Sequence, residues 1–172
     1  LTCDCGVSAV EPVAQARELG MQVVVTDHHE PGAILPNAHA LINPHLAHSR
    51  YPFVHLSGAG IVFKFCAGLT RDMGLPLDKY YNAFLDLAAL GTVADVMPIV
   101  SENRVIAKFG LERLAVSKKH GLAAMRALIY PGKSDLKLTT TDIGFKFGPR
   151  LNAAGRLEDA DASLRLLLTR DP

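Results

Sequence analysis

Apolar residues divide the first part of the chain into a strand, a helix and a second strand. Residues 21–26 form a short run rich in β-branched valine, which is typical of a buried strand. Before this run, Ser8 and Glu11 have the spacing of a capping box, and apolar positions recur through residues 10–19, so we expect a helix there. Residues 1–6 resemble the end of an earlier strand. Since strands joined by a helix are normally parallel, the pattern predicts an α/β fold, a parallel sheet flanked by helices.

Helical periodicity dominates the rest of the chain. We predict helices over residues 58–73, from about residue 79 to Gly91, over 103–116 and over 162–169. Between residues 31 and 56 we expect an irregular loop whose histidines are solvated: His39, His45, His48 and His55. We assign residues 1–130 to one α/β domain that is incomplete at its N-terminus. Residues 131–172 are expected to begin a helical linker to a second domain that is missing.

Polar side chains follow both predicted strands. Asp4 comes after the first strand, and Asp27-His28-His29 comes directly after the second. The carboxyl ends of parallel strands share one edge of a sheet, where open α/β folds bind ligands, so we expect these side chains to converge. Asp95 is a third candidate because it stands in an apolar segment, although it could instead cap the element that follows.

The segment Pro149-Arg150-Leu151-Asn152-Ala153-Ala154-Gly155-Arg156 places two arginines around an asparagine among small residues. Such an array can grip phosphate bidentately. A helix junction with two surface arginines is the alternative interpretation.

Charge and composition narrow the class of protein. Residues 1–100 carry a net charge of −4 and residues 101–172 a net charge of +5, which suits cation binding in one part and polyanion binding in the other. No apolar stretch reaches the length of a membrane span, and no leader opens the chain, so we expect a cytoplasmic protein. We also expect a monomer. Three cysteines predict no disulfide. Cys3 and Cys5 could join the two histidines in a zinc site, but strand alternation favours buried packing roles for both.

Aspartate and imidazole together favour Mn²⁺, Mg²⁺ or Zn²⁺. Two such ions about 3.5–4 Å apart would activate water and stabilise displacement at phosphorus, as in phosphatases and nucleases. The ordered set of Asp4, Asp27-His28-His29, Asp95 and the segment 149–156 resembles the DHH phosphoesterase superfamily over essentially the whole chain. More narrowly, it resembles that superfamily's single-strand-specific DNA exonucleases.

The resemblance implies a role for each candidate residue. Asp4 would bridge two Mn²⁺ or Mg²⁺ ions, His28 and Asp95 would complete one metal site, and His29 would contact the scissile phosphate. Asp27 would orient the histidine pair. The DNA-facing residues would be Arg150, Asn152 and Arg156. The implied reaction is hydrolysis of single-stranded DNA from its 5′ end in repair and recombination, with repair or replication proteins as partners of the parent enzyme.

The resemblance also implies parts that this sequence lacks. Members of the superfamily carry an upstream strand with an Asp-x-Asp signature and a downstream domain with a Gly-Gly-His motif. We expect both to be missing here. With so few ligands left, we predict at most one occupied metal site and little or no nuclease activity in this fragment. Two alternatives remain, a phosphodiesterase of short oligonucleotides and a catalytically silent nucleic-acid-binding scaffold.

Overall fold

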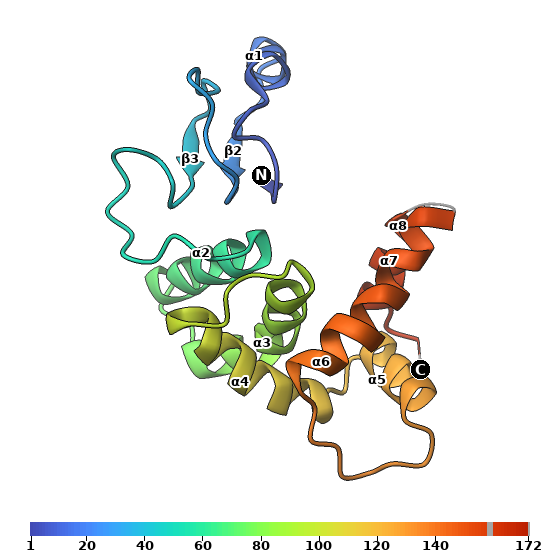
Figure 1. Ribbon diagram of the computed structural model, residues 1–172. Coiled ribbons are helices and arrows are strands. Elements are labelled where there is room, and N and C mark those ends of the chain that lie inside the picture. The colour runs from blue at the N-terminus through green and yellow to red at the C-terminus, as the bar shows by residue number, and fades with distance from the viewer. Residues whose placement is uncertain (158–159, 172) are drawn as a thin grey trace.

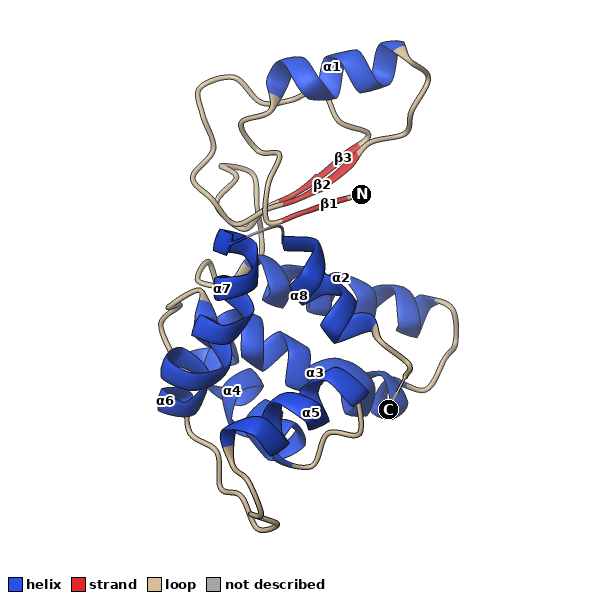
Figure 2. Cartoon of the chain, turned by 90° about the vertical axis from the view of Figure 1, so that its right-hand side faces the viewer, coloured by secondary structure: helices blue, strands red, loops and turns tan. Residues whose placement is uncertain are grey.

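The chain folds into a small parallel sheet at one end and a larger group of helices at the other (Figure 1 and Figure 2). The computed structural model describes residues 1–157 and 160–171, and all side chains in these ranges except those of 154–157. The described strands are β1 (Thr2–Cys3), β2 (Val24–Thr26) and β3 (Ala40–Ile42), paired in that order. All pairs are parallel, with Thr2 opposite Val25 and Val25 opposite Leu41. The predicted α/β class is confirmed.

Helix α1 (Val10–Glu18) connects β1 to β2, as expected, but it begins differently. Its N-cap is Ala9, which makes no side-chain capping bond, so the predicted Ser8–Glu11 capping box is wrong. Gly6 has a φ of 114° in the turn that leads into the helix, a conformation that favours glycine. Gly20, with a φ of 82°, ends the segment by donating its N–H to the Arg17 carbonyl.

Strand β3 lies inside the stretch predicted to be an irregular loop. Only three residues pair with β2, too few to produce a strand pattern among the surrounding prolines and histidines. Two of those histidines have structural partners. His39 Nδ1 accepts a hydrogen bond from the Val23 N–H at 3.0 Å, and His45 Nδ1 lies 2.9 Å from Glu30 Oε1.

Helix α2 (Gly58–Asp72) packs against the sheet, α3 (Leu77–Ala94) packs on α2, and α4 (Ser101–Ala115) packs on α3. The prediction that the middle helix stops at Gly91 is wrong, because Gly91 lies inside α3. A Cβ on Gly91 would lie 2.5 Å from the Ala59 Cβ, so this glycine allows α2 and α3 to cross closely. The core between these helices contains Phe53, Leu56, Ile61, Phe63, Ala88, Ala89 and Ile106.

The C-terminal part is helical, as predicted. It comprises α5 (His120–Ile129), α6 (Thr140–Asp142), the π-helical segment η1 (Ile143–Phe147), α7 (Gly148–Leu157) and α8 (Ala160–Leu168). A second core lies between α3, α4, α5 and η1 and is formed by Leu90, Leu114, Leu122, Met125, Ile143 and Phe147. Among the residues that the structure describes, no helix is both long and apolar enough to cross a membrane.

Candidate metal centre

Asp4 lies where β1 ends and faces the start of α2. Its N–H donates to the Thr26 carbonyl at 3.0 Å, which continues the strand pairing by one residue. Its φ of 63° then turns the chain, a conformation that aspartate tolerates better than most residues. The side chain is about half exposed and touches Gly58. A carboxylate is thereby fixed between the sheet edge and the first turn of α2.

Asp27 is buried and organises the strand exit. Its carboxylate accepts hydrogen bonds from the N–H groups of Val7 at 2.8 Å, His28 at 2.8 Å and His29 at 3.2 Å, and from the His29 ring. Burial by itself would raise the pKa of Asp27, but these hydrogen bonds outweigh it and hold the pKa below the usual value. Asp27 therefore stays ionised and orients the two histidines after it.

His28 is a nearly buried side chain that lies between two carboxylates. Its Nε2 lies 3.0 Å from Asp4 Oδ1 and 3.5 Å from Asp95 Oδ2, and the side chain is only 9% exposed. Despite these neighbours, this buried nitrogen makes no hydrogen bond of acceptable geometry with the described residues. Buried polar atoms are seldom left unpaired, so a nitrogen placed between two carboxylates fits a metal ligand.

His29 lies at the mouth of the site and is 62% exposed. Its Nδ1 is 2.7 Å from Asp27 Oδ1, and this hydrogen bond raises the pKa of His29. A proton on Nδ1 leaves Nε2 of the neutral ring as an acceptor or ligand. One nitrogen from each histidine and one Asp4 oxygen all lie within 4.8 Å of one another.

Asp95 enters the site from the end of α3. It is the C-terminal cap of that helix, so the alternative that it caps the next element is wrong. Burial and the nearby Asp4 raise its pKa, while His28 acts in the opposite direction. Val96 follows at a φ of 57°, which is rare for a β-branched residue. The carboxylates of Asp4 and Asp95 thus converge on one imidazole, and a shared cation would relieve their mutual repulsion.

The side chains of Asp4, His28 and Asp95 suit one divalent cation. Two carboxylates and an imidazole are an acceptable donor set for Mn²⁺, and for Mg²⁺ with water completing the octahedron. Asp4, His28 and Asp95 would hold the ion, which would supply a Lewis acid and an activated water when bound.

Substituting Gly58 with alanine is expected to weaken Mn²⁺ binding and to lower the melting temperature. The new Cβ would lie 2.3 Å from Asp4 Oδ1 and 2.5 Å from Asp4 Cβ, so the whole Asp4 side chain and the turn that carries it have to move. Gly68→Ala is a matched control on the same helix, because a Cβ there meets nothing within 4 Å. Calorimetric Mn²⁺ titration and thermal unfolding of both variants check this. Equal Mn²⁺ affinities would contradict it.

The predicted DNA-facing residues are partly brought to this site. Asn152 is exposed and lines a shallow groove that includes the residue before Asp95. The other groove residues are Ala94, Gly144, Gly148, Pro149 and Ala153. Arg150 is exposed, with Nη1 donating to the Lys146 carbonyl at 2.9 Å. The side chain of Arg156 lies outside the described residues.

Two supporting residues, Asn43 and Gly58, were given no role in the sequence-based prediction. Asn43 follows β3 and donates its Nδ2 hydrogen to the His29 carbonyl at 2.8 Å, so it holds the histidine turn from the third strand. A polar residue directly after Leu41-Ile42 was the available signal. Gly58 left no such signal, because its importance comes from its contact with Asp4.

The prediction that Cys3 and Cys5 are buried packing residues is wrong. Cys3 and Cys5 are exposed rather than buried, because only two residues of β1 are paired and the chain turns at Asp4. Although Cys3 is exposed, neighbouring groups partly shield its thiol from water, and this shielding together with the charge of Asp4 raises the pKa of Cys3 and keeps the thiol protonated. Neither cysteine belongs to the cluster of His, Cys, Asp and Glu ligand atoms found among the described side chains.

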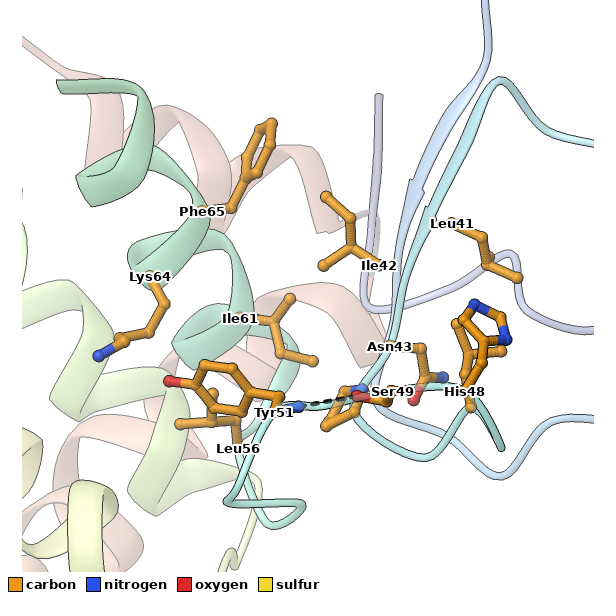
Figure 3. Close-up of a pocket in the computed structure, with 12 residues that line it drawn as sticks. Leu41, Ile42, Asn43, His48, Ser49, Tyr51, Leu56, Ile61, Lys64 and Phe65 are labelled. Carbon is orange, nitrogen blue, oxygen red and sulfur yellow. Dashed lines mark hydrogen bonds between the residues drawn. The ribbon is translucent and has the colours of Figure 1, made fainter. Parts of the chain in front are cut away.

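A separate cavity of about 380 Å³ lies between β3, α2 and the loop that joins them (Figure 3). Its walls are mainly apolar, with Ile42, Leu56, Ile61 and Phe65 among them. Tyr51 and Lys64 stand at its edge, and both contact Glu102. None of Asp4, His28, His29 and Asp95 lines it, so the largely apolar cavity and the polar cluster are different features.

Comparison with known proteins identifies the family of this chain. Residues 1–92 match the DHH family, N-terminal domain. RecJ, the single-stranded-DNA-specific exonuclease, is 42% identical over 172 residues in Bacillus subtilis (strain 168) and 42% identical over 178 residues in Escherichia coli (strain K12). These alignments cover 99% and 98% of this chain but only 21% and 30% of the relatives, so the chain spans less than a third of their length.

Solved structures give the same result for the fold. RecJ from Thermus thermophilus in complex with Mn²⁺ superposes with a TM-score of 0.85 and 34% identity, covering 99% of this chain and 24% of that one. A second exonuclease RecJ, bound to manganese, gives 0.84 and 37%, covering 99% and 41%. The family match extends over more than half of the sequence and contains Asp4 and the histidine pair. The chain therefore belongs to the DHH family.

Proposed function

We propose that this chain forms the metal-binding part of a nuclease that hydrolyses single-stranded DNA from its 5′ end. The observation that carries the proposal is the buried, unpaired Nε2 of His28 between Asp4 and Asp95. Relatives 42% identical to this chain are single-stranded-DNA-specific exonucleases, and similar structures contain Mn²⁺. Both are consistent with phosphodiester chemistry at this cluster.

Each site residue has a defined task in this proposal. Asp4, His28 and Asp95 would hold the cation, which when bound would supply a Lewis acid for the phosphodiester and an activated water. His29 stands at the exposed mouth, where Nε2 can contact the scissile phosphate while Asp27 fixes the ring through Nδ1. The strand would pass along the groove next to Asp95, where Asn152 contacts it, with Arg150 and Arg156 binding phosphates.

Ligand number sets the expected activity of the 172-residue chain alone. Three protein ligands support one ion with water, whereas hydrolysis by two ions needs further ligands. We therefore propose at most one occupied metal site and little or no turnover by the isolated chain. A protein of the relatives' length that contains this chain would act in DNA repair and recombination.

The test compares digestion of a single-stranded oligonucleotide, labelled at either end, with digestion of the same sequence as a duplex. The protein of the relatives' length should shorten the single strand from its 5′ end with Mn²⁺ and not with EDTA, and it should spare the duplex. The same protein with His28→Ala should be inactive. Digestion that persists in EDTA, or that starts from the 3′ end, would contradict the proposal. A preference for dinucleotides would favour a short-oligonucleotide phosphodiesterase.

A further inference from the structure

The first turn of α2 is tied to the last turn of α3 by two buried hydroxyl groups. Ser57 caps α2, with its Oγ accepting a hydrogen bond from the Gly60 N–H at 3.0 Å. The same Oγ lies 3.1 Å from Thr92 Oγ1. Ser57 is 1% exposed and Thr92 is fully buried. A hydrogen bond so enclosed is not exchanged for water, so it holds the two helices at a fixed separation.

The Ser57–Thr92 hydrogen bond lies between the elements that carry Asp4 and Asp95, the two carboxylates of the candidate metal centre. On one side, Gly58 directly follows Ser57 and packs against the Asp4 side chain. On the other side, Thr92 precedes Asp95 by three residues in the last turn of α3. The first turn of α2 is therefore sandwiched between Asp4 and the helix end that carries Asp95.

Close packing makes this arrangement stiff. Gly91, next to Thr92, has no Cβ, and one added there would lie 2.5 Å from the Ala59 Cβ. Helices α2 and α3 are therefore already in close contact at this point. The Ser57–Thr92 hydrogen bond then fixes their rotation and translation relative to each other. A metal centre tolerates only about 0.5 Å of misplacement of its ligands.

We propose that Ser57 and Thr92 are positioning residues that set the separation of Asp4 and Asp95, so that both reach a cation held by His28. Neither hydroxyl touches the cation or the substrate. Their effect is transmitted through α2 to Asp4 and through α3 to Asp95. The inference rests on the proposed metal centre and adds two residues to it, both buried and outside the cluster.

The test uses two substitutions of Thr92. Thr92→Val keeps the shape and removes the hydroxyl, whereas Thr92→Ser keeps the hydroxyl. Calorimetric Mn²⁺ titration should show about 10–100-fold weaker binding for Thr92→Val, the usual effect of losing a group that orients a metal ligand. Thr92→Ser should stay near the wild-type affinity. Ser57→Ala cuts the same link from α2, and the double variant should bind no more weakly than the weaker single variant.

Ser117→Ala is the matched control for stability. Ser117 is also buried and donates its hydroxyl hydrogen to Asp86 at 2.8 Å, but that pair lies outside the metal centre. It should lower the melting temperature at least as much as Thr92→Val, because its partner is a charged carboxylate, and leave Mn²⁺ affinity unchanged. Wild-type affinity in Thr92→Val, or equal weakening in Ser117→Ala, overturns the inference while leaving the metal centre intact. A wild-type chain that binds no Mn²⁺ overturns both.

Discussion

Asp4→Asn is expected to remove Mn²⁺ binding while the chain remains folded. Asparagine matches the shape of aspartate and tolerates the φ of 63° at this position, so the turn after β1 should survive. The half-exposed side chain contributes little to the core. What disappears is one of the two carboxylates next to His28 Nε2, and with it the charge that attracts the cation.

The size of this effect follows from the small number of ligands. Losing a group that merely orients a ligand weakens binding about 10–100-fold, so losing one of three ligands should exceed roughly 100-fold. Calorimetric titration with Mn²⁺ measures it. Asp72→Asn is the control, because it removes the same charge from an exposed residue at the end of α2. If the two variants bind Mn²⁺ equally, Asp4 is not a ligand.

Asp27→Ala is expected to lower the free energy of unfolding by about 3 kcal/mol or more, since bonds to a buried charge contribute about 1.5–3 kcal/mol each and buried donors are left unpaired. The donors concerned are the N–H groups of Val7 and His28, together with the backbone and ring of His29. Urea unfolding measures the loss. His29→Ala, which removes only the ring contact, should cost much less.

The same carboxylate makes stability depend on pH in a known direction. Because the folded-state pKa of Asp27 is lowered, its stabilisation is complete above the unfolded-state value of about 4 and is lost as pH falls through the folded-state pKa. Asp27 also raises the pKa of His29, so the comparison is made with His29→Ala in both proteins, which removes that second titration. In this background the stability gap between Asp27 and Asp27→Ala should be constant near neutral pH and shrink below about pH 4. A gap that widens on acidification would show that Asp27 is not stabilised in its ionised form.

Local sequence patterns predicted those parts of the fold that depend on local forces. The valine-rich run became β2, and the apolar stripes after Gly58 and Ser101 became α2 and α4. The parallel crossover then placed Asp4 and His28 at one sheet edge, with 3.0 Å between their side-chain atoms. Alternation along β1 failed for Cys3, because a strand of two paired residues does not enforce it.

Tertiary contacts determined what local patterns missed. Gly91 has the character of a helix end, but the close approach of Ala59 keeps it inside α3, and the longer helix carries Asp95 to His28. Sixty-seven positions separate these two residues, so their contact came only from the family resemblance. Strand β3 is stabilised by pairing with β2 rather than by its own propensity.

The proposed chemistry depends on one divalent cation held by Asp4, His28 and Asp95. X-ray diffraction from crystals of this chain grown with Mn²⁺, recorded at the manganese absorption edge, locates the ion directly. We expect an anomalous peak within bonding distance of His28 Nε2 and of an oxygen from each aspartate. An anomalous peak only at other side chains, with no metal ion bound to His28 Nε2, would contradict this metal site.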